Sequence, residues 1–167
     1  ENDIGNPDDA NGQDQVQAYI RSSAISTTGA LSLQATSTEA IDAFVLAGSV
    51  AIGGGSVGVG ASVAGTASVN NIANHTAAFI DGDAKAITAG SIDIAAADSS
   101  VISTSTAAAS LSAGFGETAV SVSIGVARAL DAIDNDVYAG ISGGQTVETT
   151  SGKVAVDAKR GGSITAV

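Results

Sequence analysis

The sequence predicts an all-β protein, and within that class a β-solenoid (parallel β-helix) built from repeats of about 61 residues. Three observations support this fold: the chain repeats itself, apolar and polar residues alternate with a period of two, and the side chains are small. The chain has 167 residues, of which 44% are hydrophobic and only 3% aromatic. The alternative architecture is an antiparallel β-sandwich or roll.

The repeat is clearest in a strand-like motif. GALSLQA at residues 29–35 returns as GSIDIAA at 90–96 and as GKVAVDA at 152–158, so the offsets are 90 − 29 = 61 and 152 − 90 = 62. Two repeats (about 15–75 and 76–136) and a partial third (137–167) would form a single solenoid domain over 15–167. We expect coils of about twenty residues, three to a repeat. Residues 1–14 lie outside the pattern and would be an acidic linker or an assembly clasp.

The alternation indicates half-buried strands. Leu33, Ile94 and Val156 occupy equivalent positions and should form one inward column. In the run SVAIGGGSVGVGASVAG (residues 49–65), valine and isoleucine should face inward on both sides of a glycine turn at 53–55. Clusters of Asn and Asp, such as residues 70–71 and 131–136, are expected at turns.

Composition narrows the classes of function. The chain carries 17 acidic and 6 basic residues, a net charge of −11, which disfavours a nucleic-acid partner. There is no cysteine, so disulfides and thiolate metal sites are excluded. There is no methionine, so we expect a piece of a longer product. The apolar run 43–67 alternates and is rich in Gly and Ser, so no transmembrane segment is predicted.

The order of motifs resembles a known kind of protein. NHTAAFI at residues 74–80, GSIDIAA at 90–96 and AGSVAIGGGSVGVG at 47–60 are similar to repeats of giant secreted bacterial surface adhesins, of the filamentous-haemagglutinin and leukotoxin-repeat kind. The similarity extends from Val16 to the last residue. It implies an extracellular, cell-surface location, a structural or adhesive role in a bacterial fibre or adhesin stalk, and no catalytic motif.

Two acidic groups are candidate Ca²⁺ ligands, because Ca²⁺ prefers several oxygen ligands. The first comprises Asp131, Asp134 and Asp136, for which the alternative is a turn capped by its own side chains. The second comprises Asp8, Asp9 and Asp14, for which the alternative is a solvated linker. No other cofactor is expected.

The remaining candidates concern surfaces and catalysis. Tyr19 and Phe79 are equivalent, and their rings should point outward, either as an interface with another subunit or as a local cover of the sheet. His75 lacks partners for chemistry. Asp93 and Asp157 are expected as outward counterparts that a polysaccharide-cleaving solenoid would use, but aromatic residues are scarce and no enzyme is predicted.

The predicted function is therefore a structural or adhesive subunit that assembles end to end with itself through exposed β-edges. The alternatives are a monomeric module that binds a glycan or a cell surface, and a polysaccharide-cleaving enzyme.

Overall fold

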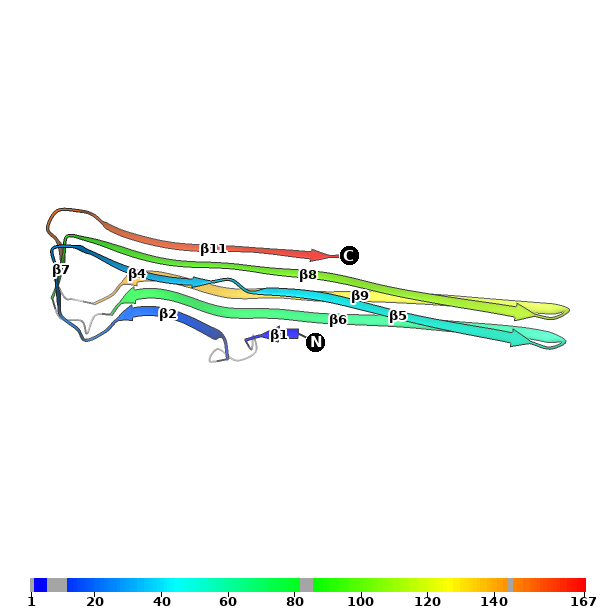
Figure 1. Ribbon diagram of the computed structural model, residues 1–167. Coiled ribbons are helices and arrows are strands. Elements are labelled where there is room, and N and C mark those ends of the chain that lie inside the picture. Colours follow the sequence, from blue (N-terminus) through cyan, green and yellow to red (C-terminus); the bar gives the residue numbers. More distant parts are fainter. Residues whose placement is uncertain (1, 6–11, 82–85, 144–145) are drawn as a thin grey trace.

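The computed structural model of the chain describes residues 2–5, 12–81, 86–143 and 146–167, and strands dominate it (Figure 1). The described part contains no helix, in agreement with the predicted all-β class. The strands, in chain order, are β1 (Asn2–Ile4), β2 (Asp14–Ile20), β3 (Ile25–Ser26), β4 (Ala30–Ser37), β5 (Ala40–Gly54), β6 (Val57–Ile80), β7 (Ile87–Ala89), β8 (Ser91–Phe115), β9 (Thr118–Ile141), β10 (Val147–Thr149) and β11 (Val154–Ala166).

The strands form three sheets, and all pairs among the described strands are parallel. One long sheet joins β1 and β2 to β6 and β9, the other joins β4 and β5 to β8 and β11, and a short sheet contains β3, β7 and β10. The antiparallel alternative is therefore wrong. Leu33 pairs with Ile94 and Ile94 with Val156, so the predicted column is confirmed.

Paired residues in the long sheets are 60 to 62 positions apart, except that β1 pairs with residues 68 positions later. β6 pairs with β9 from Val57↔Thr118 to Ile80↔Ile141, and β5 pairs with β8 from Ala40↔Val101 to Gly54↔Phe115. The expected coil of about twenty residues is therefore wrong, because the chain travels a full repeat before it lies beside itself. The strands β6 and β8 are long, with 24 and 25 residues, and neither contains a proline that would interrupt the ladder.

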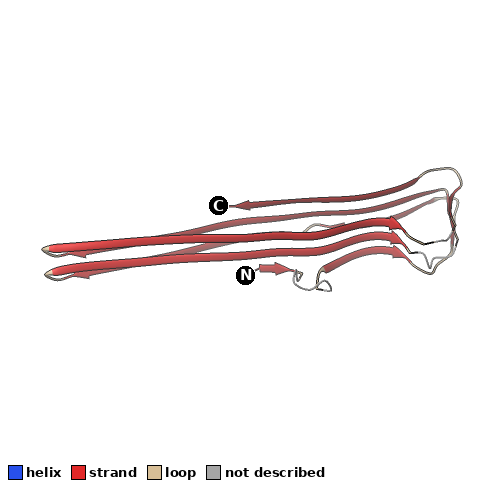
Figure 2. Ribbon diagram, turned by 180° about the vertical axis from the view of Figure 1, so that it is seen from behind, coloured by secondary structure: helices blue, strands red, loops and turns tan. Residues whose placement is uncertain are grey.

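The result is a thin, elongated body with two unlike ends (Figures 1 and 2). At one end, here called the proximal end, the short strands β3, β7 and β10 connect the two long sheets. At the other end, the distal tip, β5 turns into β6 at Gly55 and Ser56, and β8 turns into β9 at Gly116 and Glu117. The first turn overlaps the predicted glycine turn at 53–55 only at Gly55, because Gly53 and Gly54 belong to β5. Each of the two turns joins strands of different sheets.

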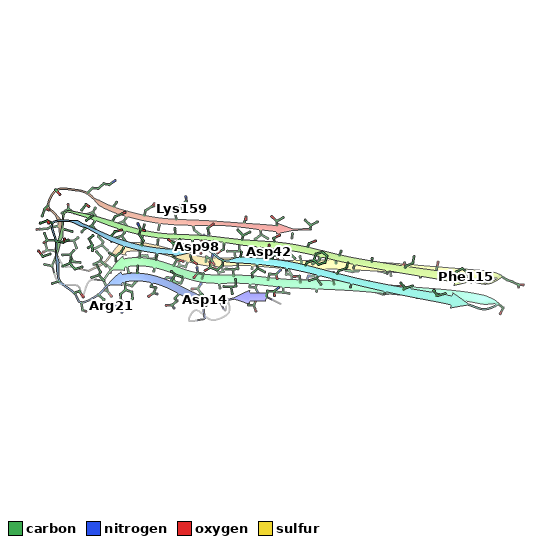
Figure 3. All side chains as sticks on the ribbon, in the orientation of Figure 1. Asp14, Arg21, Asp42, Asp98, Phe115 and Lys159 are labelled. Atoms are coloured by element: carbon green, nitrogen blue, oxygen red, sulfur yellow. The ribbon has the colours of Figure 1, made fainter. Side chains whose placement is uncertain are left out.

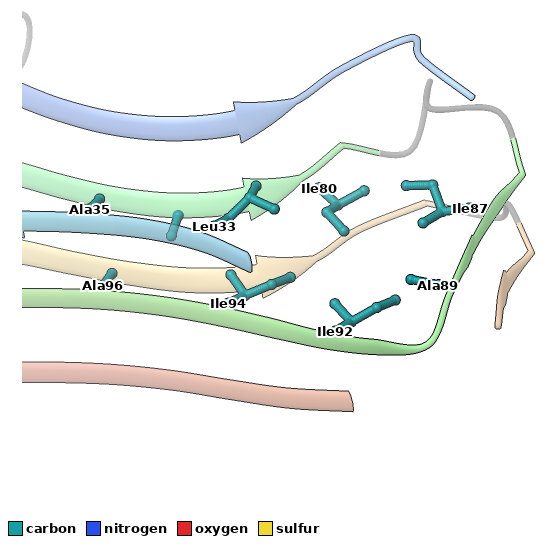
Figure 4. Packing of buried hydrophobic residues seen from close by; sticks show 9 residues of the cluster. Leu33, Ala35, Ile80, Ile87, Ala89, Ile92, Ile94 and Ala96 are labelled. Atoms are coloured by element: carbon teal, nitrogen blue, oxygen red, sulfur yellow. The ribbon is translucent and has the colours of Figure 1, made fainter. Parts of the chain in front are cut away.

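The proximal half has an apolar core (Figure 4). Ile80, Ile87, Ile92 and Ile94 are at most 1% exposed and pack with alanines of the same strands. Leu33 belongs to the same cluster. Side chains pointing inward from the two long sheets fill the space between them, as the period of two predicted.

Polar side chains occupy the middle of the body. Asn74, Asp98 and Asn135 are each at most 3% exposed, although they lie within strands. The expectation that residues 70–71 and 131–136 form turns is therefore wrong, because the first belong to β6 and the second to β9. Inward Asn and Asp side chains bond to one another across the sheets, so they need no turn.

The distal half reverses the predicted orientation. The inward positions of β6 are small: Gly58, Gly60, Ser62 and Ala64 are buried. The valines that alternate with them, and Val50 and Ile52 of the facing strand β5, face solvent, so the expectation that these residues form the core is wrong. These exposed residues are Val50, Ile52, Val57, Val59 and Val63.

Candidate interaction surfaces

The interior of the distal half is held together by contacts between small residues of the two sheets. Ser49 Oγ lies 2.6 Å from Ser62 Oγ, and one repeat later Ser110 Oγ lies 3.0 Å from Ser123 Oγ. A Cβ atom on Gly60 would lie 2.7 Å from the carbonyl oxygen of Ala113, which real Cβ atoms do not tolerate. The two backbones are therefore in contact, closer than the separation of about 10 Å found where side chains fill the space between sheets.

The two outer surfaces of the distal half are apolar. We call them the distal faces: one lies over residues 57–66 and 118–127, the other over residues 43–54 and 104–115. Ile52 is 73% exposed, Val59 64% and Ile124 49%. None of these residues carries a charge, whereas the chain as a whole has a net charge of −11. Exposed apolar surface of this extent is typical of an interaction site.

Charged side chains lie outside these four segments: Glu117 is in the turn at the distal tip, and Asp42 and Arg128 border the distal faces. Figure 3 places Arg21, Asp14 and Lys159 toward the proximal end and in the middle, with Phe115 at the distal tip. Arg21 Nε donates to Asp81 Oδ2 at 2.8 Å, an exposed ion pair of adjacent passes of the chain. Such pairs contribute at most about 1 kcal/mol, so they do not organise the fold.

The predicted aromatic residues share one side of the molecule. Tyr19 pairs with Phe79 in register, and their rings stack with centroids 5.5 Å apart. Tyr138 adds a third ring, 6.2 Å from Phe79, although the residue in register with Phe79 is Gly140. The Tyr138 ring lies over Gly140, where a Cβ atom would be 3.1 Å from its Cε1 atom. The ring thus covers the bare glycine backbone and completes the column.

This column suits a local cover better than a platform for sugars. Tyr19 and Phe79 are nearly parallel, with an interplanar angle of 15°, so each ring turns a face toward the other. The guanidinium carbon of Arg21 lies 5.4 Å from the centre of the Tyr19 ring, within the range of a cation–π contact. Ring faces that are used within the protein are less open to the face-on stacking that sugars require.

The buried polar layer was missed by the sequence analysis. Asn135 Nδ2 donates to Asp98 Oδ1 at 2.6 Å, and Asn74 Nδ2 donates to Asp98 Oδ2 at 3.0 Å. Ser100 Oγ donates to Glu39 Oε2 at 3.1 Å. A signal was present, because Asn74 and Asn135 are 61 residues apart and share parity with the inward isoleucines of their strands.

A second polar layer lies nearer the distal tip. Asn70 Nδ2 donates to Thr104 Oγ1 at 2.8 Å and to Asp131 Oδ1 at 2.7 Å, while Asn2 Nδ2 donates to Asn70 Oδ1 at 2.7 Å. Asn2, Asn70 and Asp131 thus stack in successive passes of the chain. Part of the segment expected to be a linker or clasp is therefore a strand, β1, paired with residues 70–72.

The predicted calcium ligands do not converge. Asp131 points inward to Asn70, whereas Asp134 and Asp136 are exposed on the opposite face of β9, since side chains alternate along a strand. Asp14 is exposed at the start of β2 and in register with Asn74. Asp8 and Asp9 lie outside the described residues. Among the described residues there is no group of three or more acidic, His or Cys side chains that could hold a metal ion.

The residues considered for catalysis are not in register with one another. Asp93 is in register with Ala155, and Asp157 with Ala95, so the expectation that the two aspartates are counterparts is wrong. His75 is in register with Asp136, and its Nδ1 lies 3.0 Å from Asp136 Oδ2. This exposed pair joins adjacent strands as other cross-strand pairs do.

The upper and lower edges of the stack remain open in the described structure. β9 pairs only with β6, and β5 only with β8, so the outer edge of each has unpaired backbone groups. At the upper end, a hollow of about 490 Å³ lies between the sheets, lined by Ile133, Arg160, Gly161, Gly162, Ser163 and Ile164. Arg160 Nη1 crosses this hollow to donate to the Asn135 carbonyl at 2.8 Å.

Fold and surfaces together define an all-β protein made of parallel strands, with open strand edges and apolar outer faces. In the part of the chain that the structure describes, no helix is long and apolar enough to cross a membrane. A scan against protein-family models, a search of curated proteins and a search of solved structures each found no significant match to this chain.

Proposed function

We propose that the chain is a β-solenoid with one coil per repeat of about 61 residues, and that it serves as a structural segment of an extracellular fibre or adhesin stalk. The similarity of its motifs to the repeats of secreted bacterial surface adhesins suggests the location and the adhesive role. The observation that carries the mechanical role is the register: two complete long strands, β6 and β9, pair over 24 residues at a constant offset of 61. Such a stack can be extended without any change of geometry.

The open upper end supports extension by a further coil. Ile41, Ile102 and Ile164 form one inward column, but Ile164 is 48% exposed whereas Ile102 is fully buried. The exposed isoleucine lines the hollow between the sheets, where the inward side chain of a next coil would lie. A strand laid along β9 would also satisfy the unpaired backbone groups of that edge. We propose that another copy of the chain supplies this coil.

Electron microscopy of the purified chain tests this proposal. The wild type should form long fibres, and Ile164→Lys should abolish them because the added coil would bury an unpaired charge. Thr165→Lys is the matched control, since Thr165 is the outward neighbour on the same edge strand, and it should leave fibres intact. Both variants should melt at the wild-type temperature. Dispersed wild-type particles, or fibres in Ile164→Lys, would overturn the proposal.

A further inference from the structure

The distal half is built with its apolar residues outside, although the same strands could have buried them. Side chains alternate with a period of two, so a shift of one residue would bring Val50, Ile52 and Val59 inward and the small residues outward. The chain instead fits Gly60 against the backbone of Ala113. The thin interior is thus complete without the valines, and their exposure requires a reason outside the single chain.

The shape of the distal faces suits another β-sheet. Aligned sheets pack through alternating apolar side chains that interdigitate across about 10 Å. On the face formed by β5 and β8, the in-register pair Gly48 and Ala109 lies beside the larger pair Val50 and Leu111, and these residues help to line a shallow groove of about 300 Å³. On the face formed by β6 and β9, Val59 pairs with Val120 and Val63 with Ile124 in raised rows. The raised rows of one face and the groove of the other have complementary shapes, which suits sheet-on-sheet packing.

Among the outer faces of the molecule, those of the distal half are the ones that carry no charge to oppose contact between copies. Residues 43–66, 99–116 and 118–127 contain no Asp, Glu, Lys or Arg, so all 17 acidic residues lie outside these three segments. Two copies with a net charge of −11 each repel one another elsewhere, while their distal faces can approach without desolvating a charge. A lipid surface fits less well, because the open edges of β5 and β9 would remain unsatisfied in hydrocarbon.

The area of each face sets the strength of the contact. With about 3.3 Å per residue and about 4.8 Å between strands, the face with ten residues on each of two strands covers about 320 Å², and the face with twelve covers about 380 Å². A stable interface takes about 800 Å² from each partner, so one face of one chain supplies about half. Each coil added by stacking enlarges the face in proportion, so contact between stacks is much stronger than contact between single chains.

We infer that the distal faces are lateral interfaces, on which a second copy of this chain packs sheet against sheet. This inference goes beyond end-to-end stacking and uses different surfaces. The strength of the lateral contact rests on the proposed stacking, because stacking enlarges each face. The choice of the distal faces as the contact surfaces does not rest on it. In a fibre, stacking at the strand edges would then set the length, and packing between distal faces would set the width.

The test compares two charged variants with a matched control. Val50→Glu and Val59→Glu each place a carboxylate on one distal face, at positions that are 71% and 64% exposed. Thr36→Glu places the same charge on an exposed position of β4 in the proximal half. Fibre width is measured by electron microscopy, and self-association by sedimentation velocity over a range of concentrations. Circular dichroism verifies that all variants fold.

We expect wild type and Thr36→Glu to form broad, laterally paired fibres, and the two valine variants to form single fibres of normal length. Their lateral association should weaken by at least about tenfold, since burial of an unpaired charge costs more than 1.4 kcal/mol. If no fibre forms but small oligomers of the wild type are lost in Val59→Glu, stacking fails while this inference stands. Unchanged width in both valine variants would overturn it. So would flotation of the wild type with phosphatidylcholine vesicles that Val59→Glu abolishes.

Discussion

The proximal and distal halves of this chain use the same strands and the same alternation, yet their interiors are filled in opposite ways. In the proximal half Ile80, Ile92 and Ile94 fill the space between the sheets, and in the distal half Gly60, Ser62 and Ala64 leave almost none. The large side chains of the distal half then lie on the outside. One half thus stabilises itself by burying apolar surface, whereas the other does so by contact between backbones and leaves its apolar surface exposed.

The largest expected effect tests the proximal core. Replacing Ile94, which is fully buried, by alanine should destabilise the protein by about 2–5 kcal/mol, because it removes buried methyl groups and leaves a cavity. Val59→Ala, at an exposed distal position, should cost less than about 0.5 kcal/mol. Urea unfolding of dilute protein, followed by circular dichroism, measures both. Equal losses would mean that the two halves do not differ as described.

The second-largest loss of stability is expected when the polar layer between the two halves is disrupted. Asn135→Ala removes the 2.6 Å hydrogen bond to the buried carboxylate of Asp98. The loss should be about 1–3 kcal/mol, since a buried acceptor is left without its donor. Asp134→Ala changes the adjacent, outward residue and should be close to neutral. A neutral Asn135→Ala in the same urea titration would show that the layer does not stabilise the fold.

A methyl group added to the distal interior should lower the stability by an amount similar to, or smaller than, that expected for Asn135→Ala. Gly60→Ala places a Cβ atom 2.7 Å from the Ala113 carbonyl oxygen, so the sheets must separate locally. We expect a cost of about 1–3 kcal/mol. Gly54→Ala is the matched control, because its Cβ atom would meet nothing within 4 Å. Thermal melting distinguishes them, and indistinguishable melting temperatures would contradict backbone contact in the distal half.

The smallest effect concerns the paired serines of the distal interior. Ser49→Ala alone should cost about 0.5–1.5 kcal/mol, because Ser62 loses its partner at 2.6 Å. The double variant Ser49→Ala and Ser62→Ala should recover part of that loss, since no hydroxyl is then left unpaired. A double-mutant cycle from urea titrations measures the coupling. Strictly additive losses would show that the two hydroxyls do not interact.

Much of the fold could be predicted from particular residues. The motif at 29–35 and its returns at 90–96 and 152–158 placed Leu33, Ile94 and Val156 in one column, which the register confirms. Tyr19 and Phe79 were correctly placed outward and side by side. Asn and Asp were misread as turn residues, because the same side chains cap turns and form ladders, and only the facing strand decides between these roles.

The distal faces could not be predicted because their pattern is symmetric. In GSVGVGASVAG, small and large residues alternate. The alternation predicts that the small and the large residues lie on opposite faces of the strand, but it does not predict which face is inside. The Ser49–Ser62 and Ser110–Ser123 contacts decide this, and each joins residues of different sheets. The position of the Tyr138 ring above Gly140 was also not predicted. The ring reaches from its own register position to the next one along the strand, and the residue pattern does not indicate such a reach.

The sequence by itself determined the strand class and the repeat of about 61 residues, because the alternation and the return of a motif are properties of the chain alone. It left parallel and antiparallel pairing open, and the strand register decided between them. Only the tertiary structure decided how far the chain travels before it returns and which side of the distal strands lies inside. Both depend on how closely the two sheets approach. That separation is set by the side chains and backbones that meet across it, not by any local pattern along one strand.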